Sequence, residues 1–239
     1  ACNRILNKSV SHKKIAENYF IIWADSSKNL TNGHGAKDEL HKYYLDLIYG
    51  NISNKNIVSD KLNKLYNLGN VNDGGGFDTV SCQFSIHYFF KNKEMLDTFL
   101  TNVSMSLKKG GRFIATCLNG TMVFDTLKDD DIISNDGDIM CWKITKRYTN
   151  TEFIPDDSSL GIMIDVYNES IGTTFKEYLV NLDYLESICL NYNLKLVENV
   201  NFSKMFTNLK DTEYGSIKNI TEDLKRYSFL NNYVVFEKI

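Results

Sequence analysis

The sequence has almost no proline, no paired-cysteine motif, no long apolar run and no large excess of one charge. No apolar stretch approaches the roughly 20 residues that cross a membrane, and no signal-peptide pattern opens the chain, so we predict an intracellular protein without a membrane partner. Basic and acidic residues number 27 and 30, which argues against a protein that coats polyanions. The five cysteines form no CxxC pair, and no histidine lies near them at metal-ligand spacing. We therefore expect reduced thiols and no metal site.

The scarcity of proline has a compositional counterpart. Pro155 is the only proline, whereas asparagine and lysine are abundant. This bias fits an AT-rich genome, such as that of a large virus or a protist. We expect a cytoplasmic location in the first case and a nuclear one in a cellular organism.

The residues that are present predict one α/β domain. Hydrophobic residues make up 43% of the 239, enough for a large core without disulfides. Runs of aromatic and β-branched residues alternate with segments of helical periodicity. The expected strands lie at 18–24, 77–84, 112–117, 140–148, 161–167, 194–197 and 233–236, and the expected helices at 37–48, 93–108 and 181–192.

The clearest local unit runs from the buried strand at 77–84 through the helix at 93–108 to the next strand. Asn92 is a candidate N-cap of that helix and Gly110 a candidate C-cap. Strand, helix and strand in this order are typical of a parallel α/β sheet, whose ligands bind at the carboxyl ends of the strands. The short strands between about 138 and 175 predict a small antiparallel insertion or lid.

Five segments carry a resemblance to a known family: Gln83–Phe90, Leu107–Ile114, Ala24–Lys28, Glu177–Val180 and Tyr233–Lys238. Taken in chain order, they resemble the mRNA cap guanine-N7 methyltransferases, which depend on S-adenosylmethionine. The resemblance covers nearly the whole chain, and the block QFSIHYFF is its most specific part. It implies a class I (Rossmann-like) methyltransferase fold, S-adenosyl-L-methionine as the cofactor and a 5′ capped RNA end as the partner.

Two features of the family are absent from this sequence. Family members have a glycine-rich loop after their first strand and an acidic residue at the end of their second. Gly74–Gly76 precedes a different strand and is better interpreted as a loop. Aligned on the family, Ala1 follows the second strand. We therefore expect residues 1–239 to be a single methyltransferase domain that is N-terminally truncated, without the first strands of the fold, and unstable by itself.

The resemblance assigns four residues to the cofactor. Asp25 matches the residue that accepts from the adenine amino group, with Ser26 beside it, and the alternative for Asp25 is a cap of the next helix. Gln83 matches a residue that lines the adenosine pocket. Tyr88 matches one that contacts both ligands and shapes the channel for methyl transfer.

The resemblance assigns four residues to the cap. Glu177 faces the Watson–Crick edge of guanine, where a carboxylate accepts from N1–H and N2–H, and His87 hydrogen-bonds the purine edge. Arg4 matches an arginine directed at the triphosphate, and Tyr233 a tyrosine that contacts the base. Guanine N7 has its own lone pair, so we predict no acid or base catalyst and assign positioning to Glu177, His87 and Tyr88. The alternatives are a solvated Glu177, a His87–Tyr88 pair in the core and a core position for Tyr233.

The leading hypothesis is an mRNA cap guanine-N7 methyltransferase. Triphosphatase and guanylyltransferase domains of the same polypeptide, or an activating subunit, are its expected partners. Where the family commonly has a proline near the guanine, this sequence has Leu118, which offers a similar apolar contact. The alternatives are a class I methyltransferase with another acceptor and a catalytically silent methyltransferase-like subunit.

Overall fold

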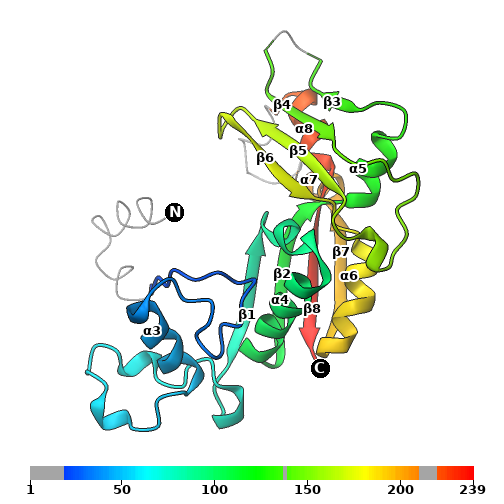
Figure 1. The fold of residues 1–239 in the computed structure, drawn as a ribbon. Helices are drawn as coiled ribbons and strands as arrows, with labels where there is room; N and C mark the ends of the chain where they lie inside the picture. The colour runs from blue at the N-terminus through cyan, green and yellow to red at the C-terminus, as the bar shows by residue number, and fades with distance from the viewer. Residues whose placement is uncertain (1–18, 137–138, 210–219) are drawn as a thin grey trace. The chain divides into compact units, whose positions relative to one another are not determined.

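The computed structural model describes residues 19–136, 139–209 and 220–239. The chain divides into two compact units, residues 1–68 and 69–239 (Figure 1).

The first unit is built around one helix. Helix α3 (Glu39–Tyr49) begins at Asp38, whose side chain accepts the His41 N–H, and ends at Gly50 in the left-handed conformation. Its buried face consists of Leu45, Leu47 and Ile48, close to the predicted helix at 37–48. The short 3-10 helices η1 (Lys55–Ile57) and η2 (Asn63–Leu65) follow in the long connection.

The predicted buried strand at 18–24 is wrong. Within its described residues only Ala24 forms a bridge, to Ala36, and the Tyr19 and Trp23 side chains are exposed. Aromatic and β-branched residues favour a strand because they pack on a pleated, half-buried surface. No described strand pairs with this segment, so the sequence preference has no such surface to act on.

The first sheet of the second unit contains four strands in the order β1–β2–β8–β7: β1 (Phe77–Gln83), β2 (Leu107–Leu118), β8 (Asn231–Lys238) and β7 (Leu194–Asn201). β1 and β2 are parallel, and the other two pairs are antiparallel. Helices α4 (Lys93–Ser106) and α6 (Leu182–Cys189) cover one face, as Figure 1 shows. Their apolar sides share one core with the sheet, which confirms the predicted α/β class.

Local sequence explains the unit from β1 to β2 with two exceptions. The Asn92 side chain accepts the Met95 N–H, so the predicted N-cap of α4 is confirmed. The predicted C-cap is wrong: the helix ends at Ser106, and Gly110 lies within β2, with φ 78°. β1 is half-exposed rather than buried because it lies at an edge of the described sheet.

The second sheet of this unit is entirely antiparallel. Its strands are β3 (Ile132–Ser134), β4 (Trp142–Lys146), β5 (Met163–Asn168) and β6 (Thr173–Tyr178), in that order. Trp142, Ile144 and Ile164 form the centre of its own core, which α5 (Gly120–Thr126) also contacts. This sheet contains the antiparallel strands that the sequence predicts at 140–148 and 161–167.

The backbone at Gly120 makes a close contact between the two sheets. The Gly120 N–H donates to the Val180 carbonyl at 2.9 Å, immediately after a bridge between Asn119 and Val180. A Cβ on Gly120 would lie 2.4 Å from that carbonyl oxygen, so only glycine fits.

Two further helices complete the described chain, α7 (Phe202–Leu209) and α8 (Glu222–Phe229), with the 3-10 helices η3 (Val71–Asp73), η4 (Ile86–Lys91), η5 (Asp157–Ser159) and η6 (Leu190–Tyr192). None of the described helices is long and apolar enough to cross a membrane. The four described cysteines, Cys82, Cys117, Cys141 and Cys189, are free thiols as expected.

Candidate active site

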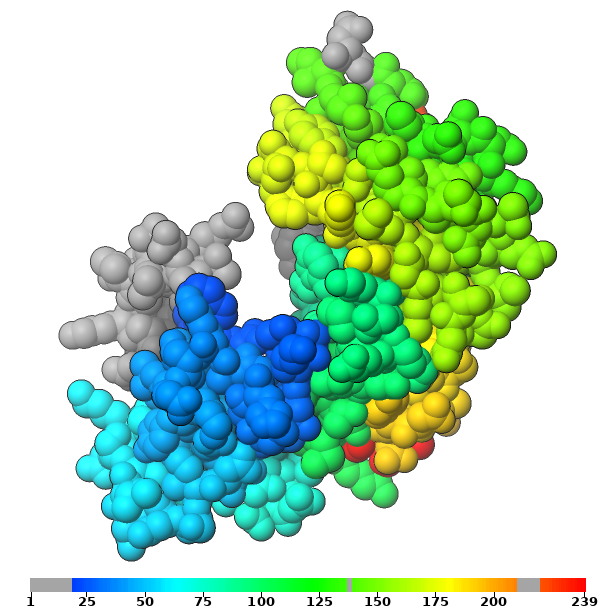
Figure 2. Space-filling view, in the orientation of Figure 1, coloured from blue at the N-terminus to red at the C-terminus, as the bar shows by residue number. Residues whose placement is uncertain are grey.

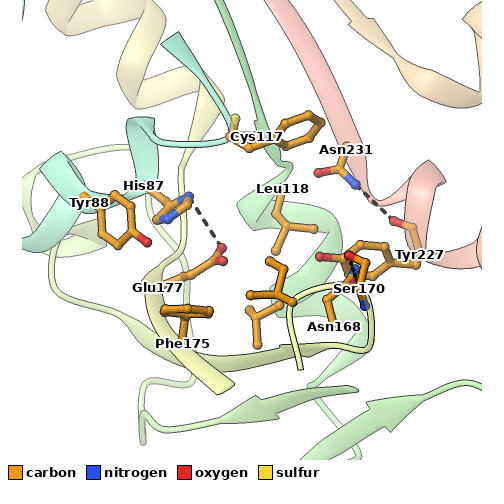
Figure 3. Close-up of a pocket in the computed structure, with 13 residues that line it drawn as sticks. His87, Tyr88, Cys117, Leu118, Asn168, Ser170, Phe175, Glu177, Tyr227 and Asn231 are labelled. Carbon is orange, nitrogen blue, oxygen red and sulfur yellow. Dashed lines mark hydrogen bonds and ion pairs between the residues drawn. The ribbon is translucent and has the colours of Figure 1, made fainter. Parts of the chain in front are cut away.

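A cavity of about 500 Å³ opens in the second unit at the carboxyl ends of β1 and β2. Residues of both sheets line it, and in the space-filling view the surface of the β5–β6 hairpin (yellow) lies next to that of η4 (blue-green) (Figure 2). A pocket of this size suits a small ligand or a nucleotide. Its lining comprises Phe84, His87, Tyr88, Cys117, Leu118, Val166, Asn168, Ser170, Ile171, Phe175, Glu177, Tyr227 and Asn231 (Figure 3).

Two of the predicted site residues meet in this pocket. η4 follows β1 directly and carries His87, while β6 carries Glu177 opposite Ile164 of β5. His87 Nδ1 lies 3.5 Å from Glu177 Oε2. Phe175 lies two residues before Glu177 on β6, so both side chains project from the same face of the strand (Figure 3).

Burial controls the charge of this pair. It lowers the pKa of His87 to about 4 and raises the pKa of Glu177 to about 7, because each charged form loses its hydration. Near pH 7 the imidazole is therefore uncharged, and about half of the Glu177 carboxyls carry a proton. The contact at 3.5 Å is that of a largely neutral pair rather than of an ion pair. His87 Nε2 is buried and has no hydrogen-bond partner among the described residues, so it is available to a ligand.

The rim of the pocket is aromatic. Tyr88 and Phe84 are 44% and 54% exposed, so both rings offer apolar surface to a ligand. Phe84 also has a φ of 50°, in the left-handed region that bulky residues avoid. Its N–H donates to the Thr116 carbonyl at 3.0 Å, which helps to hold this backbone conformation. Strained residues of this kind cluster at ligand sites.

Gln83, predicted to bind the cofactor, ends β1 next to this rim. Its Oε1 accepts from the Thr116 hydroxyl at 2.9 Å, and its Nε2 donates to the Ser81 hydroxyl at 2.8 Å. The side chain is exposed and oriented by both contacts, but it is not among the residues that line the cavity.

Sequence reasoning missed the side of the pocket formed by Asn168, Ser170, Tyr227 and Asn231. Tyr227 lies on α8, in a stretch that gave no strong periodic signal, and Asn168 and Ser170 lie at the β5–β6 turn. The only available signal was the polar, turn-forming composition of Asn168-Glu169-Ser170. Tyr233, the predicted aromatic contact, is not among the lining residues, and its hydroxyl donates to Glu198 Oε2 at 2.7 Å.

The remaining predicted residues lie in the first unit. The Asp25 carboxylate accepts the N–H of Ser27 at 2.9 Å and its hydroxyl at 2.7 Å. These hydrogen bonds hold the pKa of Asp25 below its usual value, so the exposed carboxylate stays ionised. Ser26 follows in the same turn, half-buried. Arg4 lies outside the described residues.

The α/β sheet and its pocket define a ligand-binding α/β domain, with a buried imidazole and a half-buried carboxyl paired where such sheets bind their ligands. Residues 25–231 match the family model of the mRNA (guanine-N(7))-methyltransferase domain. The chain therefore belongs to this family of S-adenosylmethionine-dependent methyltransferases, as predicted.

Individual relatives agree with the family match. A probable mRNA-capping enzyme of Acanthamoeba polyphaga mimivirus is 31% identical, over 69% of this chain and 17% of that protein. The mRNA cap guanine-N(7) methyltransferase of Candida albicans is 27% identical, over 62% of this chain and 33% of that protein. The chain thus spans a third or less of these relatives. A solved structure of a putative S-adenosylmethionine-dependent methyltransferase from Listeria monocytogenes matches with a TM-score of 0.42 at 12% identity, over 69% of this chain and 62% of that one.

Proposed function

We propose that this chain transfers a methyl group from S-adenosylmethionine to N7 of the guanine at the 5′ cap of RNA. One observation carries the proposal: in a member of this family, Glu177 and His87 meet at 3.5 Å in a pocket at the carboxyl ends of the parallel strands. Guanine presents two donors, N1–H and N2–H, beside the acceptor O6. A carboxylate complements the two donors of that edge.

The chain's contribution to this reaction is positioning and electrostatics. Ionised Glu177 accepts N1–H and N2–H, and it stabilises the positive charge that the guanine ring acquires as N7 is methylated. His87 Nε2, which has no partner among the described residues, hydrogen-bonds the purine edge, as the family resemblance implies. Leu118 is buried in the pocket wall and contacts the base, and Tyr88 closes the pocket at its rim. Because N7 has a lone pair, no residue needs to remove a proton.

Each residue that the resemblance assigns to the cofactor has side-chain chemistry that suits contact with an adenosine. Asp25 is an exposed, ionised acceptor for an adenine amino group, Ser26 lies beside it, and Gln83 and Tyr88 flank the strained turn at Phe84. S-adenosylmethionine supplies a methyl group on a positively charged sulfur, which is an activated leaving group. The family resemblance assigns its binding and orientation to Asp25, Ser26, Gln83 and Tyr88, and exclusion of water by the aromatic rim would favour transfer to the base.

The proposal includes a capped RNA end as the partner. Arg4 contacts the triphosphate and Tyr233 contributes an aromatic contact, as the family resemblance implies. Triphosphatase and guanylyltransferase domains in the same polypeptide, or an activating subunit, supply and support this step inside the cell. A mimivirus capping enzyme among the relatives is consistent with a viral source.

The test is methyl transfer from labelled S-adenosylmethionine to GpppA-RNA by the complete natural polypeptide. We expect N7-methylguanosine after nuclease digestion, with loss of at least 100-fold in Glu177→Ala, because the variant loses the charge-assisted acceptor. Glu186→Ala is the matched control, since Glu186 is exposed on α6, outside the pocket lining. Cofactor binding without transfer to any capped RNA would instead favour a silent subunit or another acceptor.

A further inference from the structure

The antiparallel sheet has a second face that the pocket does not use. Its core face packs against α5 and α8, and Figure 3 shows Phe175 and Glu177 of β6 directed into the cavity. Because side chains alternate along a strand, Lys176 between them projects from the opposite, outer face. The strand register places four more charged or aromatic side chains on this outer face: Lys143, Arg147, Asp165 and Tyr167.

The outer face has an excess of positive charge, although the chain as a whole has a net charge of −3. Asp165 is the single carboxylate among the strand residues of this face, and its Oδ2 pairs with Arg147 Nε at 2.7 Å. Lys143 and Lys176 have no ion-pair partner in the part of the chain that the structure describes. Two ammonium groups of the outer face are therefore available to an anion.

Tyr167 lies on the strand between these two lysines. Lys143 of β4 is its direct cross-strand partner, and Lys176 of β6 lies two residues after its other partner, Thr174 (Figure 1). Neighbouring strands are about 4.8 Å apart, so one extended ligand can contact all three side chains. Proteins that bind single-stranded nucleic acid combine cations that contact phosphates with aromatic rings on which bases stack. The outer face has both kinds of group on three adjacent strands.

Strand β6 connects the outer face to the pocket. It is the last strand of its sheet, and residues Thr173–Lys176 are exposed. An RNA whose cap guanine is held at Glu177 therefore has to cross only this edge strand to reach Lys176. Phosphodiester groups and unpaired bases are what follow the cap in such an RNA.

Resting on the proposed function, we infer that the outer face binds the single-stranded RNA that follows the cap. Lys176 and Lys143 contact phosphates, and a base stacks on the ring of Tyr167. These contacts carry no sequence preference, because phosphates and base faces are common to all RNAs. The outer face thus favours a capped RNA over a free cap dinucleotide.

The test compares GpppA with a capped RNA of about ten nucleotides and with the same RNA uncapped, within the usual span of single-strand sites. Affinities are measured by calorimetry with the complete natural polypeptide and saturating S-adenosylhomocysteine. We expect the capped RNA to bind tighter than GpppA, and Lys143→Gln/Lys176→Gln to remove most of this gain without changing the affinity for GpppA. The double variant should also lower the slope of log affinity against log salt by about 1.4, since each phosphate contact to a single strand contributes about 0.7.

Lys109→Gln/Lys195→Gln is the matched control. It removes the same charge at exposed positions of β2 and β7, outside the antiparallel sheet, so the gain and the salt slope should stay as in wild type. An equal loss in both double variants would show a general effect of net charge and overturn the inference.

Tyr167 provides a second, independent variant. Tyr167→Ala should weaken binding of the capped RNA about 5-fold or more, whereas Tyr167→Phe keeps the ring and should bind as wild type does. Unchanged affinity for GpppA in both variants shows that the pocket is intact. Wild-type affinity for capped RNA in Lys143→Gln/Lys176→Gln would overturn the inference and leave the outer face to a protein partner. A wild type that binds capped and uncapped RNA equally would overturn the proposed function instead.

Discussion

His87 Nδ1 and Glu177 Oε2 lie 3.5 Å apart in a pocket that disfavours charge on either group. One side chain follows a strand of the α/β sheet, and the other belongs to the antiparallel sheet. Burial shifts the two pKa values in opposite directions, past each other. This arrangement has consequences for stability as well as for recognition.

The pair predicts opposing effects of pH on stability. Between pH 4.5 and 7 the folded chain keeps a proton on Glu177 that the unfolded chain loses, so the free energy of unfolding falls as pH rises. Between pH 6.5 and 4 the unfolded chain binds a proton on His87 that the folded chain lacks, so the free energy of unfolding falls as pH falls. In wild type the two slopes cancel between pH 4.5 and 6.5.

Urea unfolding of single variants separates these slopes. Relative to wild type, Glu177→Gln should gain stability as pH rises from 4.5 to 6.5, and His87→Gln should gain it as pH falls over the same range. Each slope should reach up to about 1.4 kcal/mol per pH unit. Parallel curves for wild type and both variants would show that these groups titrate normally in the folded chain.

Recognition of the cap should depend on pH through the same carboxyl. Only ionised Glu177 accepts both N1–H and N2–H, and its pKa is raised to about 7. Affinity for GpppA should therefore be about tenfold higher at pH 8 than at pH 6. Glu177→Gln should bind weakly at both values, without this dependence. An equal affinity of wild type at both values would contradict the assigned role.

We predict that substitution of Phe84 has opposite effects on stability and on ligand binding. Its φ of 50° costs about 1 kcal/mol relative to glycine, and its exposed ring buries little surface. Phe84→Gly should therefore leave the free energy of unfolding unchanged or raise it by up to about 1 kcal/mol. The same change should weaken binding of S-adenosylhomocysteine or GpppA, because it removes the ring from the pocket rim. A large loss of stability without loss of binding would assign Phe84 to the core.

Gly120 predicts a localised structural requirement. Gly120→Ala forces a Cβ against the Val180 carbonyl and should destabilise the chain by about 2–4 kcal/mol. Gly172→Ala is the control: its φ is 76° but no atom lies within 4 Å of the added Cβ, so only about 1 kcal/mol is expected. Thermal unfolding of both variants gives the comparison, and equal losses would exclude the steric explanation.

The sequence predicted best where the determinants are local. Asn92 capped its helix as expected, and the periodicity of α4 and the order of β1, α4 and β2 followed from neighbouring residues. The strand expected at 18–24 failed because a strand also needs a partner, which local preference does not supply.

The site divides in the same way. His87, Tyr88 and Glu177 were found through a motif, and the structure brings them to one pocket. Tyr227 was missed because its place depends on packing against Trp142, which is 85 positions away in the sequence. No spacing rule connects residues so far apart.

Glu177 belongs to the antiparallel sheet, and His87 lies on η4, which follows a strand of the α/β sheet. The distance between the two side chains therefore depends on how the two sheets pack against each other. The close backbone contact between Gly120 and Val180 holds the two sheets near each other. Nitrogen-15 chemical shifts of the His87 ring would register a displacement of either layer. A signal that is normally used to assign histidine tautomers would then report a change in the packing of the two sheets.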